Sequence, residues 1–164
     1  MAYLLDADVF IRAKNLHYGF DFCPAFWNWL VEQHAIGAVF SVEKVGTELK
    51  AGEDDLSDWA TARGEAFFQV PDDHAVPSLA LVGAWARGRN YDPSAITTFL
   101  QVADYYLVAQ AHASGHVVVT HEIPSASIKR IKIPDACIGV GVTCMTPFEM
   151  LRRERARFVL GPQP

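Results

Sequence analysis

A chain of 164 residues, 51% of them hydrophobic, is long enough to form one domain around its own core. It contains no apolar run of transmembrane length and no basic leader before an apolar segment, so we expect a soluble, cytoplasmic protein with no membrane partner. The net charge of −5 argues against a simple nucleic-acid binder, and 3 cysteines without zinc-finger spacing indicate reduced thiols.

The charges are distributed unevenly along the chain. Residues 1–128 carry 7 basic and 16 acidic side chains, whereas residues 129–164 carry 7 basic and 3 acidic ones. An acidic body with a basic end suits a protein that gathers cations in one place and contacts phosphates in another. A solvated basic helix end would give the same pattern.

Short apolar segments alternate with helical patterns throughout. Strands are expected at 3–5, 38–40, 67–70, 117–119, 131–133 and 142–145. Helical patterns begin at residue 9 and occupy 24–34, 42–50, 56–63, 72–87, 93–114, 134–138 and 148–158. Because strands and helices alternate, we expect a three-layer α/β sandwich with a mainly parallel central sheet, in a single domain over residues 1–164.

The first strand leads directly into two acids. Asp6 and Asp8 follow the apolar run Tyr3-Leu4-Leu5, which has the pattern of a strand buried on both faces. Open α/β sheets place their ligand sites at the carboxyl ends of such strands. Asp6 could instead be an ordinary helix N-cap, so other segments must decide whether a site exists there.

A second buried strand, 117–119, repeats this arrangement. It is followed by Thr120 and then Glu122. Two parallel strands would bring Asp6 and Glu122 to the same edge of the sheet.

Further acids lie on two of the predicted helices. Asp104 falls on an apolar helix face, where a buried carboxylate costs several kcal/mol, roughly, unless it is paired or binds a metal. No lysine or arginine lies between Arg89 and Lys129, so a structural partner would have to come from a distant segment. Glu48 is a fourth candidate, and Glu43 on the same helix is the alternative.

These four segments together resemble the PIN-domain nucleases, and especially the VapC-like toxins. The resemblance lies in Leu5-Asp6-Ala7-Asp8-Val9-Phe10, Glu48-Leu49-Lys50-Ala51-Gly52, Ala103 to Ala111 and Val119-Thr120-His121-Glu122, in that order. It implies a metal-dependent endoribonuclease that hydrolyses RNA phosphodiester bonds. It also implies a toxin silenced by a cognate antitoxin protein, and a homodimer.

The chemistry implied for this site follows from its charges. Clustered carboxylates repel one another and need a cation, and oxygen ligands select Mg²⁺ or Mn²⁺. The metal ligands would be Asp6, Glu48, Asp104 and Glu122, with Thr120 assisting catalysis. Basic residues flanking the site would hold the RNA backbone: Arg12, Lys14, Lys129, Arg130 and Lys132.

Two other functions fit the same residues. Asp6-Ala7-Asp8-Val9 also resembles the start of a HAD-type phosphatase, with Asp6 as nucleophile, Asp8 as acid or base and Lys129 as the family's lysine. Ala7 and Glu122 also leave room for a weakened PIN fold that only binds RNA or protein. A covalent phospho-aspartate trapped with a fluoride analogue would separate the phosphatase from the nuclease. Cleavage of a mixed RNA pool that EDTA abolishes would separate the nuclease from the fold that only binds.

Overall fold

The computed structural model describes residues 1–161 and contains, within them, a five-stranded sheet that is parallel throughout. The strand order is β3-β2-β1-β4-β5. The strands are β1 (Tyr3–Leu5), β2 (Val39–Val42), β3 (Phe68–Gln69), β4 (Val117–Val119) and β5 (Cys144–Met145). The α/β class and the parallel sheet expected from the sequence are confirmed.

The two central strands are apolar because helices cover both faces of the sheet. Leu4, Leu5 and Val118 are completely buried, which is the burial that unbroken apolar strands predict. β1 and β4 pair with Leu5 opposite Val119, and the Asp6 amide donates to the Val119 carbonyl at 3.0 Å. This register places the residues after the two strands next to each other.

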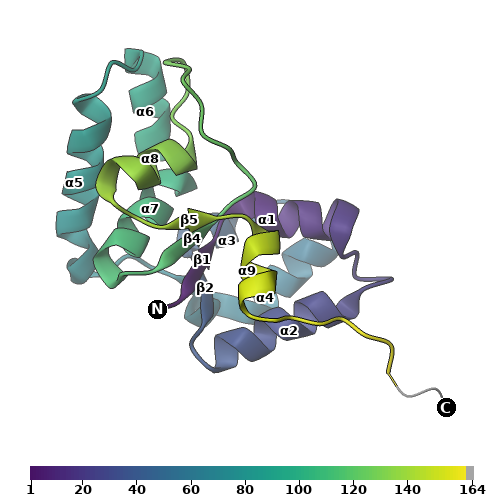
Figure 1. Cartoon of the computed structure of the whole chain (residues 1–164). Helices are drawn as coiled ribbons and strands as arrows, with labels where there is room; N and C mark the ends of the chain where they lie inside the picture. Colours follow the sequence, from purple (N-terminus) through teal and green to yellow (C-terminus); the bar gives the residue numbers. More distant parts are fainter. Residues whose placement is uncertain (162–164) are drawn as a thin grey trace.

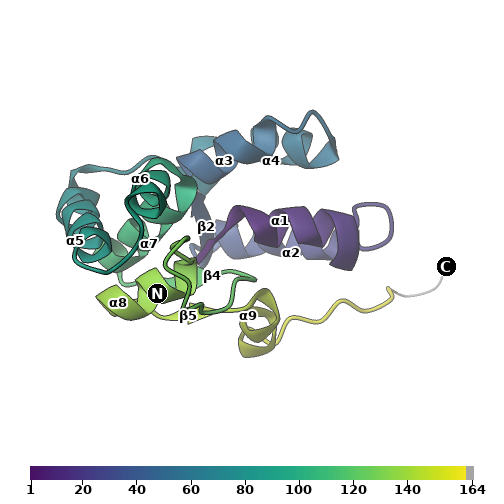
Figure 2. The same cartoon turned by 90° about the horizontal axis from the view of Figure 1, so that it is seen from above.

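Helices form a layer on each side of the sheet (Figure 1). One side holds α5 (Val76–Arg87), α6 (Pro93–Gln101), α7 (Ala103–Ser114) and α8 (Ile133–Val140). The other holds α1 (Ala7–Arg12), α2 (Pro24–Ala35), α4 (Asp55–Phe67) and α9 (Pro147–Arg153), with α3 (Glu43–Lys50) seen from above beside α4 (Figure 2). A π-helical turn, Ala13–His17, extends α1, and a 3₁₀ turn, Asp73–Ala75, precedes α5.

The long helix expected over 93–114 is two helices. The chain leaves helical geometry at Val102, where φ is −104° and ψ is 168°, so α6 ends at Gln101 and α7 begins at Ala103. Neither glycine nor proline marks this break in the sequence, and tertiary packing of the two helices therefore sets it. As a result Asp104 lies in the first turn of α7 instead of the middle of a helix.

Two further boundaries differ from expectation near the carboxyl end. Residues 131–133 form no strand: Ile133 begins α8, with Pro134 in its first turn, where proline is favoured. The last helix spans Pro147–Arg153, shorter than the expected 148–158, because Glu154 caps it and Arg155 has a positive φ of 54°. Arg155 and Arg157, which fall within the expected range, therefore lie beyond the helix.

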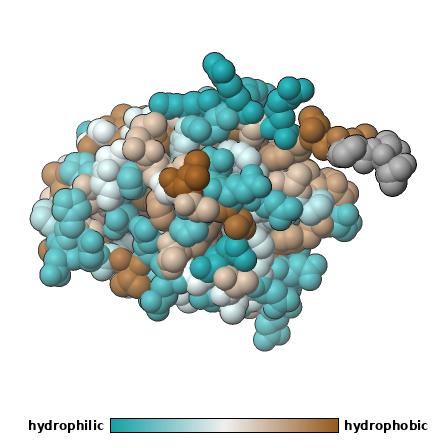
Figure 3. Space-filling view, turned by 90° about the horizontal axis from the view of Figure 1, so that it is seen from below, coloured by the Kyte–Doolittle hydropathy of each residue, from teal (hydrophilic) through white to brown (hydrophobic). Residues whose placement is uncertain are grey.

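Within residues 1–161, no helix is both long and apolar enough to cross a bilayer. Large apolar side chains that remain exposed, such as Ile36, Ile123 and Ile138, lie in separate elements. The face seen from below mixes hydrophilic and hydrophobic residues, with only small hydrophobic areas (Figure 3). Isolated exposed apolar residues of this kind are normal for a folded domain.

Candidate active site

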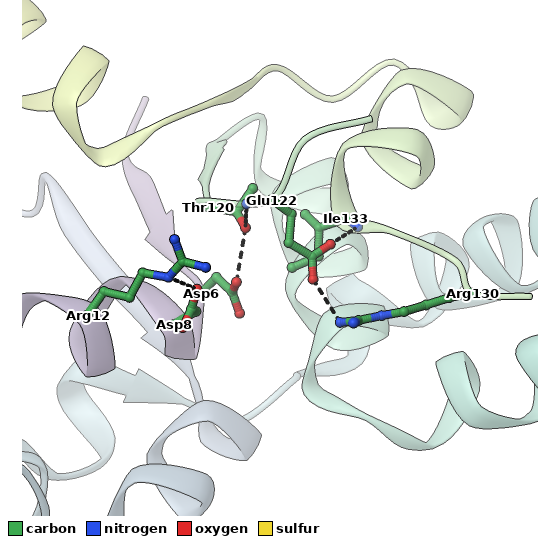
Figure 4. A network of polar contacts seen from close by, with 7 residues as sticks. All are labelled: Asp6, Asp8, Arg12, Thr120, Glu122, Arg130 and Ile133. Carbon is green, nitrogen blue, oxygen red and sulfur yellow. Dashed lines mark hydrogen bonds and ion pairs between the residues drawn. The ribbon is translucent and has the colours of Figure 1, made fainter. Parts of the chain in front are cut away.

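Asp6 and Thr120 meet at the carboxyl ends of β1 and β4. Asp6 occupies the N-cap position of α1, yet its side chain makes no capping hydrogen bond. Its Oδ2 instead accepts a hydrogen bond from the Thr120 hydroxyl at 3.0 Å (Figure 4). The Thr120 oxygen also accepts from the Glu122 amide at 3.1 Å. The simple capping role for Asp6 is therefore not observed, and its carboxylate is oriented by the neighbouring strand end.

The four predicted acids line one cavity of about 350 Å³. Asp6 follows β1, Glu48 comes from α3, Asp104 from the first turn of α7, and Glu122 from the loop after β4. Glu43, the alternative to Glu48, is not among the lining residues. The fold thus gathers carboxylates from four segments that are far apart in the sequence.

Burial and the repulsion of neighbouring acids raise the pKa of three of these side chains, Asp6, Asp104 and Glu48. Burial, then the charges of Asp104 and Glu122, raise the pKa of Asp6 to about 7 against the lowering effect of the Thr120 hydrogen bond. Burial and Glu122 likewise raise the pKa of Asp104 to about 6, although Arg130 opposes the shift. Burial and then Asp8 raise the pKa of Glu48. Asp6, Asp104 and Glu48 therefore lack the neighbouring positive charge that would offset their burial.

Two acids of the cavity, Glu122 and Asp8, are each paired with an arginine. Glu122 accepts from Arg130 Nη2 at 3.1 Å and from the Ile133 amide at 2.9 Å (Figure 4). Asp8 pairs with Arg12 at 2.7 Å. Among the ion pairs of residues 1–161, none includes Asp6, Glu48 or Asp104. The structural salt bridge considered for Asp104 is thus not found.

The predicted RNA-binding residues divide into two groups. Arg12, Arg130 and Lys132 line the acidic cavity, and Lys129 and Arg130 line a second cavity of about 530 Å³ that also includes Glu48 and Asp104. Lys14 lines neither cavity, because its amino group is drawn to Asp54 at 2.7 Å. The structure therefore places Lys14 apart from the site with which the sequence grouped it.

Asp8 is a site residue that the metal-ligand prediction omitted. It lines the acidic cavity and raises the pKa of Glu48. Its position two residues after Asp6, in the first turn of α1, was the available signal. That signal was weak because acids in a first helical turn are common for reasons of helix stability alone.

The donor set suits a hard divalent cation. Carboxylate oxygens and one hydroxyl are the ligands that Mg²⁺ and Mn²⁺ prefer, and the acids of the site would be stabilised in their ionised form by such an ion. Among residues 1–161, however, no three His, Cys, Asp or Glu side chains are arranged as a preformed metal site. Glu122 faces Arg130 and Asp8 faces Arg12, so these pairs would have to open for both acids to become ligands.

Fold and site together define an α/β protein with an acidic cavity at the carboxyl edge of a parallel sheet. The chain belongs to the family described as "Domain of unknown function (DUF4411)", whose profile matches residues 3–158. No curated protein matches it significantly. It is similar to a solved chain of VapBC2 from Rickettsia felis bound to a promoter DNA fragment, with 16% identity, a TM-score of 0.48, and coverage of 89% of this chain and 98% of that one.

Proposed function

We propose that this protein is a metal-dependent endoribonuclease of the PIN-domain type, acting as the toxin of a toxin-antitoxin pair. The observation that carries the proposal is the cavity in which Asp6, Glu48, Asp104 and Glu122 converge without enough positive charge to balance them. A cluster of this kind is costly unless it serves to hold a cation. The resemblance to VapC-like toxins, carried by the same four segments, identifies the reaction class.

The residues of the chain would divide the work of phosphodiester hydrolysis among them. Asp6, Glu48, Asp104 and Glu122 would hold Mg²⁺ or Mn²⁺, which would neutralise the scissile phosphate and activate water. Thr120 keeps the Asp6 carboxylate oriented through its 3.0 Å hydrogen bond. Arg130 and Lys132, on the rim of the same cavity, would hold the phosphates on either side.

Cleavage of a mixed RNA pool in Mn²⁺, and its loss in EDTA, tests this function. Asp104→Asn should lower the rate by about 10² to 10³, as expected when an electrostatic element of an active site is lost. Glu48→Gln should also lower it strongly, whereas Glu43→Gln, on the same helix but outside the cavity, should leave it unchanged. Unaltered cleavage by Asp104→Asn would contradict the proposal, as would cleavage that survives EDTA.

The phosphatase alternative has less support. The lysine assigned to it, Lys129, lines the neighbouring cavity and not the one that contains Asp6, where Lys132 is the lysine present. A phosphorylated Asp6 trapped with a fluoride analogue would nevertheless favour the phosphatase.

The toxin assignment further implies two protein partners, an antitoxin and a second copy of the chain. Arg152 and Arg153, exposed on α9, offer positive charge to an acidic antitoxin segment. Light scattering would measure the oligomeric state, and growth arrest on expression, relieved by a neighbouring gene product, would test the toxin role. A monomer would contradict the second copy as a partner. Expression without effect on growth would contradict the toxin role.

A further inference from the structure

A third cavity lies apart from the two cavities of the candidate active site. It has a volume of about 410 Å³ and shares no lining residue with the acidic cavity. Its walls come from the end of α5, the turn before α6, the outer part of loop 120–132, and α8. The Asp92 amide donates to the Ile128 carbonyl at 2.9 Å and so joins the loop to the start of α6. Its volume is within the usual range for small-molecule sites.

One wall of this cavity is aromatic. The rings of Trp85 and Tyr91 meet at 62° with centroids 5.9 Å apart. Trp85 is fixed against α8 at Gly139, where any side chain would collide with the indole. Its buried Nε1 has no hydrogen-bond partner in the described part of the chain, because it faces this close packing. The wall is therefore a rigid aromatic surface, which a planar ligand can contact without ordering new side chains.

The polar centre of the cavity is Asp135, on the first turn of α8. Its Oδ2 accepts from the Ser125 amide at 3.0 Å, which attaches the loop to the helix. Among residues 1–161, no hydrogen bond is made by its Oδ1. Burial and then the nearby Asp135 charge raise the pKa of Tyr91, which shows that the carboxylate and the aromatic wall are neighbours. A ligand stacked on this wall would meet an acceptor that is already held in place.

A positive charge completes the cavity. The exposed guanidinium of Arg89 lies 6.0 Å from the centroid of the Trp85 ring. An aromatic wall with a carboxylate alone would suit an organic cation, but Arg89 would repel such a ligand. A ligand with a planar ring, hydrogen-bond donors on its edge and a negative group matches all three features. Nucleotides have this composition, and guanine alone among the common bases presents two adjacent N–H donors to a single carboxylate.

We propose that this cavity binds the guanine base of a nucleotide. The base would stack on Trp85 with Tyr91 against its edge, donate from N1 and N2 to Asp135, and leave its phosphate to Arg89. The site is connected to the acidic cavity through loop 120–132, which starts beside Glu122 and ends at Lys129 to Lys132. If the chain is the nuclease proposed above, on which this step rests, the cavity makes guanine the base read near the cleavage point.

Calorimetric titration with free GMP tests the cavity without any nuclease activity. We expect GMP to bind at least about tenfold more tightly than AMP or IMP, since AMP lacks both edge donors and IMP lacks the N2 donor. Asp135→Asn should remove this preference, because asparagine can still accept from Ser125 but presents an amide group to the base. Asp73→Asn, an exposed acid outside the cavity, is the matched control and should bind GMP as the parent does.

Arg89→Gln provides a second variant that does not disturb the core, because Arg89 is exposed. It should weaken GMP binding but leave guanosine binding unchanged. Equal binding of all three nucleotides would overturn the proposal, as would absence of GMP binding or an Asp135→Asn variant with the parent's affinity and a native melting curve.

Short single-stranded RNA in EDTA distinguishes a base within RNA from a free nucleotide. An oligonucleotide with one guanine should bind more tightly than its inosine counterpart, and Asp135→Asn should abolish the difference. If GMP discriminates and the oligonucleotides do not, the cavity serves a free nucleotide and the RNA part is overturned. These measurements need no cleavage, so failure of the nuclease proposal would leave their outcome readable.

Discussion

At the scale of single residues, Asp6 is a residue of the candidate site whose ionisation lowers the stability of the folded protein. Its pKa in the folded protein is about 7, against an ordinary 3.8. Because the folded state holds this proton more tightly than the unfolded state, the contribution of Asp6 to stability is most favourable at low pH. It falls as the pH rises from about 4 to about 7 and then levels off.

Asp6→Asn should therefore stabilise the metal-free protein above neutral pH, by on the order of 3 kcal/mol. The amide keeps an oxygen for the Thr120 hydroxyl, so the loss of charge is the main change. Urea unfolding at about pH 5 and about pH 8 measures the effect, which should be larger at the higher pH. Asp73→Asn serves as the control, and a destabilised Asp6→Asn would mean that the carboxylate is structurally required.

Arg130 provides a second test at this scale, because it is the cation of the acidic cavity that pairs with Glu122. It pairs with Glu122 at 3.1 Å and lowers the pKa of Asp104. We expect Arg130→Gln to bind Mn²⁺ roughly threefold to tenfold more tightly, since the cavity loses a competing positive charge. Calorimetric titration with Mn²⁺ compares the affinity of this variant with that of Lys129→Gln, because Lys129 lines only the neighbouring cavity. Weaker Mn²⁺ binding would instead mean that Arg130 orients Glu122 as a ligand.

At the scale of elements, the sequence predicts those strands and helices whose bounds are set by neighbouring residues. β1 and β4 were expected because their apolar runs are too uniform for a half-exposed strand. The expected bounds of α2 and α3 agree with the structure to within one residue, whereas α5 begins at Val76, four residues later than expected. The break at Val102 was missed because no glycine or proline marks it. Ile131 and Ile133 alternate with Lys132 as residues of a strand would. Both are buried, but Ile131 lies in the loop before α8 and Ile133 begins α8. Three residues are too few to distinguish a strand from the start of a helix.

The candidate site was predictable to a similar extent. Asp6, Asp104, Glu122 and Thr120 follow from strand ends and from an acid on an apolar face. The choice of Glu48 over Glu43 depended on the family resemblance, because periodicity alone could not separate them. The pairing of Lys14 with Asp54 and the cavity beside Trp85 depend on contacts between distant segments, which no local pattern reports.

The last helix offers a test of local stability. Thr146 and Glu149 form a reciprocal capping box at the start of α9, with hydrogen bonds of 3.2 Å and 2.7 Å. Thr146→Ala should lower the free energy of unfolding by about 1 kcal/mol. Thr97→Ala, at an exposed position inside α6, is the control and should cost much less. Denaturant unfolding of both variants measures the two losses in the free energy of unfolding. Equal losses would show that the capping box contributes little to stability.

At the scale of the whole molecule, the uneven charge of the sequence acquires a spatial meaning. Of the 16 acids in residues 1–128, five line the acidic cavity, and Arg130 and Lys132 from the basic end of the chain line the same cavity. In the proposed function, these two cations would attract phosphates to a cavity that is otherwise lined by acids.

Replacement of Lys129, Arg130 and Lys132 by alanine should weaken RNA binding at low salt and reduce the slope of its salt dependence by about two to three. Filter binding in EDTA across a salt series measures both quantities. Replacement of Arg152 and Arg153, which line neither cavity at the site, is the matched control. Unchanged affinity in the triple variant would exclude these residues as phosphate contacts.

The pairing of β1 with β4 also governs when activity can arise. Tyr3 lies opposite Val117, so the first strand of the chain completes the sheet only after more than a hundred later residues have been made. Asp6 reaches Thr120 and Glu122 by the same closure. A nascent chain on the ribosome therefore carries its first acid long before it can assemble a site, and contacts this distant in sequence form slowly. For a nuclease, such an order of assembly protects nearby RNA until the segment that contains Thr120 and Glu122 has been made.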